Sequence, residues 1–255
     1  MKVDWDLSEY DDPKLYDIEN KKTNELAFLI KWAEKLKIKQ QTIVDLACGT
    51  GRITIPFAEK GYCLLGVDVH EGMLERAREK TKPDHNVSWI NQNCMYLILN
   101  TYSPFTYMVG RAFQHFLTDE HQHSLFQSIH HILEKKGVFI FDTMLPSKQC
   151  SSLPSTKEIY RTITDVKNRK CKIYYEMNVE ADADIIHYKL TREFLKNNSI
   201  VEERVSISKL RYTPIETLVN TLESNGFKLL HIYRGWREKP FHFDNHYIVI
   251  VCQKL

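Results

Sequence analysis

The first 142 residues alternate between short apolar runs and longer segments in which apolar residues recur every three or four positions. The runs have the length of buried strands, and the longer segments have the period of amphipathic helices. Alternation of this kind predicts βαβ units and a parallel sheet. The expected strands are residues 42–46, 63–67, 87–90, 107–109 and 138–141, and the expected helices are one that Thr23 caps and residues 52–60, 71–80 and 119–133.

The pattern changes after Pro146. From residue 158 to 212 there is no helical period, and apolar residues alternate with polar ones as in half-buried strands. We expect about four antiparallel strands there, then a helix that starts at Pro214 and ends before Gly226, and two closing strands. The expected domain organisation is one core formed by residues 1–146 and 213–255, with residues 147–212 as an antiparallel insertion.

Composition is that of a folded protein, with 43% hydrophobic and 27% charged residues in a chain of 255. The formal net charge of +2 leaves no basic field of the kind that binds nucleic acid. The acidic first twenty residues do not resemble a secretory signal peptide, and no apolar run is long enough to span a membrane. The six cysteines form no C-x-x-C pair, so we expect reduced thiols, no metal site and a cytoplasmic location.

Two glycines follow the first expected strand, and an acid ends the second. Gly49 and Gly51 lie in a strand–loop–helix unit, which brings backbone N–H groups close to a ligand. Asp68 is expected at the carboxyl end of the neighbouring strand, where it can accept both hydroxyls of a ribose. A dinucleotide enzyme has a third glycine, where this chain has Thr54. The pattern therefore predicts an adenosine-containing cofactor, either a nicotinamide dinucleotide or S-adenosylmethionine.

Longer stretches favour S-adenosylmethionine. The sequence "VDLACGTGRITIPFAEKG", followed by "LLGVDVHEGMLERAREK", resembles motif I and the second-strand motif of class I S-adenosylmethionine-dependent methyltransferases. Residues 10–20 resemble a tyrosine-bearing segment that caps the cofactor in some members. The resemblance implies an α/β, Rossmann-like, doubly wound sheet of seven mostly parallel strands, with the antiparallel insertion as a lid over the active site. The alternatives are a nicotinamide-dependent oxidoreductase and a non-catalytic S-adenosylmethionine-binding protein.

The resemblance also implies a set of cofactor-binding residues. Asn93 departs from the family, which usually has an aspartate at this adenine-edge position; an amide oxygen can still accept a bond there, without the charge-assisted part. The implied residues are Tyr16 in the capping segment, Asp45 supporting the loop, Ala47, Cys48, Gly49, Thr50 and Gly51 around the methionine and ribose, Asp68 on the ribose, Val69, Met73, Asn93, Cys94 and Met95 around the adenine, and Gly110 and Arg111 beside the methionine.

Methyl transfer is a displacement at a positively charged sulfur, so the protein mainly aligns the acceptor and excludes water. A general base is needed only if the acceptor keeps a proton on its nucleophile. His115, just past a strand end, is the candidate base; the alternative is a histidine that supports the loop or contacts the cofactor. Arg111 can bind the cofactor carboxylate or an acidic substrate, or have only a structural role in the loop.

The acceptor is not specified by the sequence. Residues 109–113 read V-G-R-A-F and lack the N/D-P-P-Y/F motif of enzymes that methylate nucleic-acid bases. The expectation is therefore a small-molecule acceptor with a nitrogen or oxygen nucleophile, no nucleic-acid or membrane partner, and a monomer or a homodimer.

Overall fold

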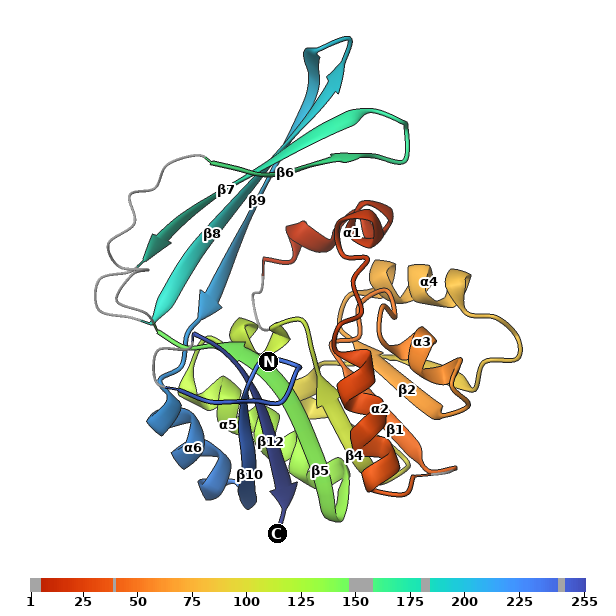
Figure 1. Ribbon diagram of the computed structural model, residues 1–255, viewed down its shortest axis with the longest axis vertical. Coiled ribbons are helices and arrows are strands. Elements are labelled where there is room, and N and C mark those ends of the chain that lie inside the picture. Colours follow the sequence, from red (N-terminus) through yellow and green to blue (C-terminus); the bar gives the residue numbers. More distant parts are fainter. Residues whose placement is uncertain (1–5, 39, 147–157, 180–183, 243–245) are drawn as a thin grey trace.

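The computed structural model describes residues 6–38, 40–146, 158–179, 184–242 and 246–255. Two sheets are present, and a short N-terminal segment lies between them (Figure 1). No helix in these ranges is long and apolar enough to cross a membrane. Residues 147–157, where the expected insertion begins, and the cysteine at position 150 lie outside the described residues.

The larger sheet has the strand order β11-β10-β12-β5-β4-β1-β2-β3. Strands β1 to β5 pair in parallel, and β12 runs antiparallel to both of its neighbours. The sheet is therefore mostly parallel, as the alternating pattern predicted. It has eight strands instead of seven because two residues, Lys239 and Pro240, add an edge strand to β10. The bounds are β1 Thr42–Leu46, β2 Cys63–Asp68, β3 Val87–Asn91, β4 Ser103–Met108, β5 Leu133–Met144, β10 Phe227–Arg234, β11 Lys239–Pro240 and β12 Tyr247–Lys254.

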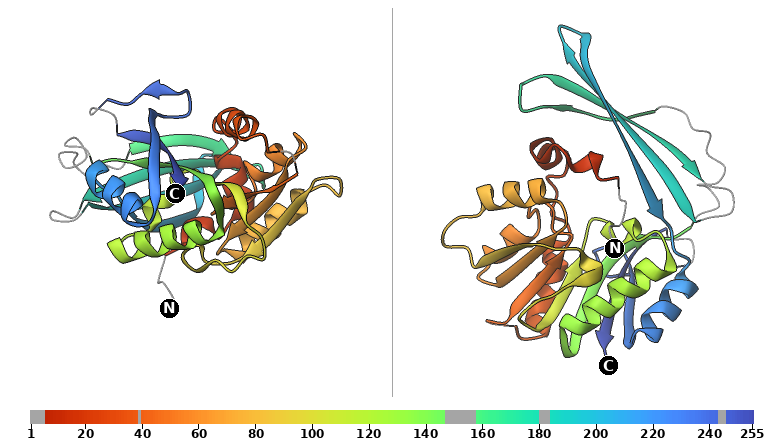
Figure 2. Two further views of the ribbon diagram at one scale, coloured as in Figure 1. Left: turned by 90° about the horizontal axis from the view of Figure 1, so that it is seen from below. Right: turned by 180° about the vertical axis from the view of Figure 1, so that it is seen from behind.

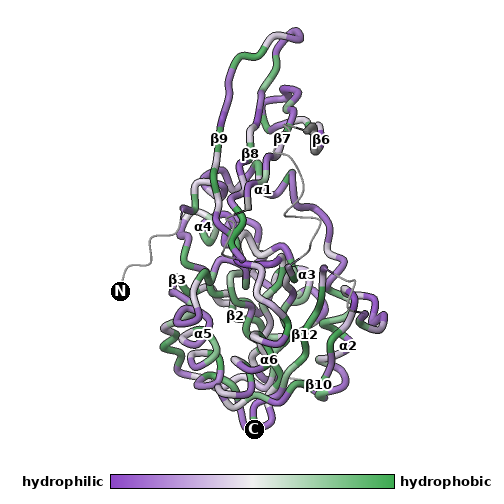
Figure 3. The backbone as a smooth tube through the Cα atoms, turned by 90° about the vertical axis from the view of Figure 1, so that its left-hand side faces the viewer, coloured by the Kyte–Doolittle hydropathy of each residue, from purple (hydrophilic) through white to green (hydrophobic). Residues whose placement is uncertain are grey.

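Helices cover both faces of this sheet (Figure 2). Apolar residues of α5 and α6 pack in one cluster with the sheet, and those of α2 and α3 pack in another. In Figure 3, hydrophobic residues accordingly lie along β10 and β12, in the lower part of the view. The helices are α1 Pro13–Glu19, α2 Leu26–Lys35, α3 Thr54–Ala58, α4 Glu71–Lys80, α5 Asp119–Ile132 and α6 Ile215–Ser224, and three short 3-10 turns are Ser8–Tyr10, Cys94–Tyr96 and Ala112–His115.

Two helix starts differ from the prediction. Thr23 does not cap α2, because the helix begins at Leu26 and the capping position is Glu25, whose carboxylate binds Arg52 instead. The helix expected at residues 52–60 is the shorter α3. Pro56 lies in its first turn, where a missing N–H breaks no helical bond. Helix α4 has the predicted bounds.

The smaller sheet confirms the expected antiparallel strands. Its order is β6-β7-β8-β9, each strand paired antiparallel with the next. Alternate residues of β7 and β8, such as Ile173 and Phe194, form a small apolar cluster that includes Leu15 of α1. The alternation seen in the sequence is thus explained by one sheet face that packs on the N-terminal segment. The bounds are β6 Glu158–Thr164, β7 Lys170–Val179, β8 Ile185–Lys196 and β9 Ser199–Arg211.

The N-terminal segment, residues 6–20, is bonded to both sheets. Asp17 accepts hydrogen bonds from Thr50 Oγ1 at 2.7 Å, Arg76 Nε at 2.9 Å and Lys80 Nζ at 2.7 Å, all on the side of the larger sheet. On the other side, the buried carboxylate of Glu19 lies 2.7 Å from Arg192 Nε of β8. The acidic charge of this segment is therefore neutralised by cations from both parts of the fold.

Candidate active site

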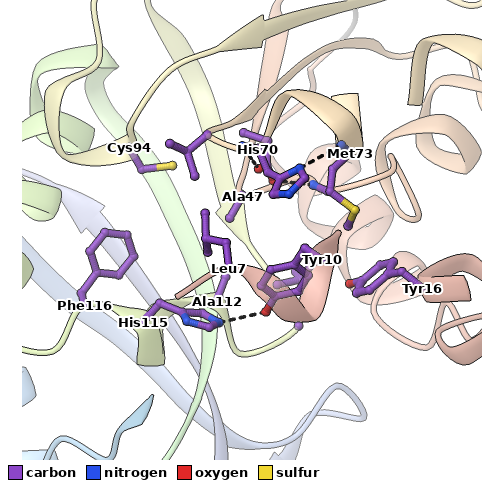
Figure 4. Close-up of a pocket in the computed structure, with 15 residues that line it drawn as sticks. Leu7, Tyr10, Tyr16, Ala47, His70, Met73, Cys94, Ala112, His115 and Phe116 are labelled. Carbon is purple, nitrogen blue, oxygen red and sulfur yellow. Dashed lines mark hydrogen bonds between the residues drawn. The ribbon is translucent and has the colours of Figure 1, made fainter. Parts of the chain in front are cut away.

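A pocket opens at the carboxyl ends of β1, β2 and β4, under the N-terminal segment (Figure 4). Parallel α/β sheets bind their ligands at this edge. Nine residues predicted from the sequence line the pocket: Tyr16, Ala47, Gly49, Asp68, Val69, Met73, Cys94, Gly110 and His115. Six further residues complete the lining: Leu7, Tyr10, His70, Val109, Ala112 and Phe116.

Asp68 is held in place by two backbone donors. The N–H of Gly49 donates to Oδ2 at 2.7 Å, and the N–H of His70 donates to Oδ1 at 2.8 Å. Burial raises the pKa of the carboxyl, and these two bonds oppose that shift. Each carboxylate oxygen can accept more than one bond. The geometry therefore suits a ligand with two adjacent hydroxyl groups.

The two loop glycines have different surroundings. Gly49 lines the pocket with φ of 56°, a conformation that favours glycine. Gly51 has φ of 75°, and a Cβ there would lie 2.5 Å from the ring of Trp89. Gly51 thus has a packing role that the sequence did not indicate: it admits the indole of β3 beneath the loop.

Asp45 lies beneath the glycine loop and is 1% exposed. Thr54 Oγ1 donates to its Oδ2 at 2.6 Å, so the threonine at the third-glycine position of a dinucleotide motif has a defined partner. Burial raises the pKa of Asp45 to about 7. Asp45 is outside the pocket lining, as are Cys48, Thr50 and Gly51. Their proposed contacts with the cofactor stay predictions.

The adenine-edge turn presents Cys94 to the pocket. Asn93 Oδ1 accepts the N–H of Met95 at 2.9 Å and so caps the turn Cys94–Tyr96. Neither Asn93 nor Met95 is in the pocket lining. Burial raises the pKa of the Cys94 thiol to about 12, which keeps it protonated as an apolar wall.

Tyr10 and His115 meet across the pocket. The Tyr10 hydroxyl is 3.0 Å from His115 Nε2, a contact between residues 105 positions apart (Figure 4). Burial and the nearby Arg111 charge lower the pKa of His115 to about 4, and burial raises that of Tyr10. Both groups are therefore uncharged at neutral pH. Tyr10 belongs to the tyrosine-bearing segment noted in the sequence, which was the available signal for it.

A chain of hydrogen bonds positions the turn before His115. Gly110 and Arg111 have φ of 75° and 65°, and the Arg111 N–H donates to both carboxylate oxygens of Asp142, at 3.1 and 3.2 Å. Tyr247 OH donates to Asp142 Oδ2 at 2.8 Å and accepts from Trp236 Nε1 at 2.5 Å. Asp142 is 1% exposed, and burial raises its pKa to about 6.

Replacing Tyr247 with phenylalanine is expected to lower the free energy of unfolding by about 1–3 kcal/mol, because a buried carboxylate loses a donor and an indole N–H loses its acceptor. Urea unfolding measures this change. Tyr102→Phe is the matched control, since that tyrosine is 63% exposed. Equal stability of the two variants would show that the chain from Trp236 to Asp142 adds nothing to the fold.

Known proteins resemble this chain in sequence and in fold. Residues 43–137 match the family described as a methyltransferase domain. The Bacillus subtilis (strain 168) protein named "Putative methyltransferase YqeM" is 26% identical over 201 residues, which is 78% of each chain. A solved S-adenosylmethionine-dependent methyltransferase from Clostridium acetobutylicum ATCC 824 superposes with a TM-score of 0.79 at 18% identity, over 97% of this chain and 96% of that one. The CcbJ methyltransferase from Streptomyces caelestis gives 0.77 at 18% identity, over 96% and 97%.

The domain match over residues 43–137, the curated relative and the shared fold support a class I S-adenosylmethionine-dependent methyltransferase. The same comparisons support S-adenosylmethionine as the cofactor. They favour S-adenosylmethionine over the nicotinamide dinucleotide that the glycine motif alone left open. The described residues contain no cluster of three or more histidine, cysteine, aspartate or glutamate side chains that could hold a metal ion.

Proposed function

We propose that this methyltransferase acts on a small molecule through a nitrogen or oxygen nucleophile. The observation that carries the proposal is the uncharged Tyr10–His115 pair, which faces the pocket beside the Gly110–Arg111 turn. The names of two solved structures with this fold state a sugar as the substrate. CalS10 is named as an amino pentose methyltransferase, and KedS8 as a sugar N-methyltransferase.

The residues of the pocket fit the cofactor. Asp68 offers a fixed carboxylate to the ribose hydroxyls, and at Gly49 a side chain would meet Met73 at 3.2 Å. Leu7 and Tyr16 of the N-terminal segment line the pocket, and their proposed role is to form the wall around the methionine and to exclude water. S-adenosylmethionine, when bound, supplies a methyl group on a positively charged sulfur.

His115 is the proposed general base. A neutral imidazole has one nitrogen that accepts a hydrogen bond, and Tyr10 OH can donate or accept to fix the tautomer. The proposed role of the pair is to orient the nucleophile and to take its proton as the methyl group is transferred. The alternative, a histidine that only supports the pocket, is tested below.

The division into a core of residues 1–146 and 213–255 and an insertion of residues 147–212 is part of the proposal. The four-stranded sheet contacts the N-terminal segment through Glu19–Arg192 and through Asp12–Arg204 at 2.8 Å, which supports a role as a lid over the acceptor. A dimer surface is the alternative. We propose a monomer or homodimer in the cytoplasm, without a nucleic-acid or membrane partner.

The acceptor class is tested by supplying the protein with S-adenosylmethionine labelled in its methyl group and a cell extract divided into low-mass compounds, RNA and protein. We expect label in the low-mass compounds, and none when the Asp68→Ala variant replaces the wild-type chain. Label in the RNA or protein portion would contradict the proposal.

A further inference from the structure

A second cavity adjoins the cofactor pocket. Tyr16 and Gly110 line both, so the two cavities meet where the sequence places the methionine part of the cofactor. The second cavity extends from this junction between the N-terminal segment, the ends of β4 and β5, and Arg161 of β6. A methyl acceptor bound in the second cavity can therefore reach the methyl group without passing through the part of the first pocket that is expected to hold the adenosine.

Part of the charge around this cavity is already paired. Arg52 binds the carboxylate of Glu25 through two nitrogens, at 2.8 and 3.0 Å. The carboxylate of Glu19 is shared by two arginines, with Arg192 Nε at 2.7 Å and Arg161 Nη2 at 3.3 Å. The Glu19 carboxylate is thus fully engaged by these two guanidinium groups.

Three further cations line the cavity, and the charge of one of them, Arg111, acts on the buried carboxylate of Asp142. Lys21, Lys22 and Arg111 line the cavity and are exposed to solvent, and none of their charged groups forms an ion pair with another described residue. The remaining acid of the lining, Asp142, is occupied by the Arg111 N–H and Tyr247. A cavity with a surplus of one charge concentrates ligands of the opposite charge.

Building on the proposed function, we infer that this cavity binds the methyl acceptor and that the acceptor carries an anionic group, a carboxylate or a phosphate ester. Lys21, Lys22 and Arg111 bind this group. The nucleophile then lies at the junction marked by Tyr16 and Gly110. The sequence alone left Arg111 between a cofactor contact, an acidic substrate and a structural role. The cavity assigns it to the substrate.

The test uses titration calorimetry on the full chain saturated with S-adenosylhomocysteine, so that the cofactor carboxylate is already in place. The probes are inorganic pyrophosphate and malonate, and the one that binds more tightly distinguishes a phosphate from a carboxylate. We expect saturable binding at one site that weakens as salt is raised. The variant Lys21→Gln/Lys22→Gln is expected to weaken it by roughly tenfold or more, and Arg111→Gln similarly.

The matched control is Lys135→Gln/Lys228→Gln, which removes the same charge from two exposed lysines outside the cavity. It is expected to change probe affinity by less than about twofold. The inference is overturned if neither probe binds, if a probe displaces S-adenosylhomocysteine, or if both lysine pairs weaken binding equally. S-adenosylhomocysteine affinity and methyl transfer are measured separately, so the proposed function can stand when the anion site fails.

Discussion

Replacing Asp68 with alanine is expected to weaken binding of S-adenosylmethionine and S-adenosylhomocysteine by roughly 30- to 150-fold, or about 2–3 kcal/mol. The reason is that this buried carboxylate is fixed by the N–H groups of Gly49 and His70 and offers its remaining acceptor capacity to the pocket. Its loss removes the proposed bonds to two ribose hydroxyls and leaves both backbone donors without their acceptor. Calorimetry with S-adenosylhomocysteine measures the change.

The comparison variant is Asn93→Ala. Asn93 makes one neutral bond to Met95 and lies outside the pocket lining, so its loss is expected to cost about 1 kcal/mol or less of binding free energy. Thermal unfolding of each variant shows whether the fold is retained. Equal losses of affinity in the two variants would mean that Asp68 does not bind the ribose.

Replacing His115 with alanine is expected to lower turnover by at least ~100-fold while S-adenosylhomocysteine binding stays unchanged. A general base contributes to the chemical step and not to cofactor affinity, which separates this role from a supporting one. Tyr10→Phe is expected to have a smaller effect, because it removes the hydroxyl partner and leaves the imidazole. Reduced binding alone, or unchanged turnover, would assign His115 to the supporting role.

The pH dependence provides an independent measurement for the same residue. The pKa of His115 is lowered from 6.5 to about 4, so the imidazole is neutral above that pH in the folded protein. Activity that needs the neutral form is therefore expected to fall only as pH approaches about 4, with no acidic limb near 6.5. Between these values the unfolded chain binds more protons than the folded one, so this histidine also makes the fold less stable as pH falls. An acidic limb near 6.5 that is absent in His115→Ala would contradict the assigned pKa.

The sequence by itself determined the features that depend on neighbours in the chain. Short apolar runs predicted the parallel strands, because a buried strand needs apolar residues on both faces. Helix α4 was predicted with its observed bounds, since its period is regular and its end is basic. Gly49 and Asp68 were found because a parallel β1–β2 pair brings the ends of two successive strands together.

Tertiary structure decided the contacts between distant residues. Tyr10 meets His115, and the Arg111 N–H donates to Asp142, which also accepts from the Tyr247 hydroxyl. Side-chain periodicity specifies which face of an element is buried, but it does not specify which other element that face will meet. The same holds for the second cavity, whose cations come from distant parts of the chain: Lys21 and Lys22 follow α1, Arg111 follows β4, and Arg161 lies in β6. The sequence thus determined the fold class and the cofactor motif, and packing determined the candidate chemistry and the charges that line the second cavity.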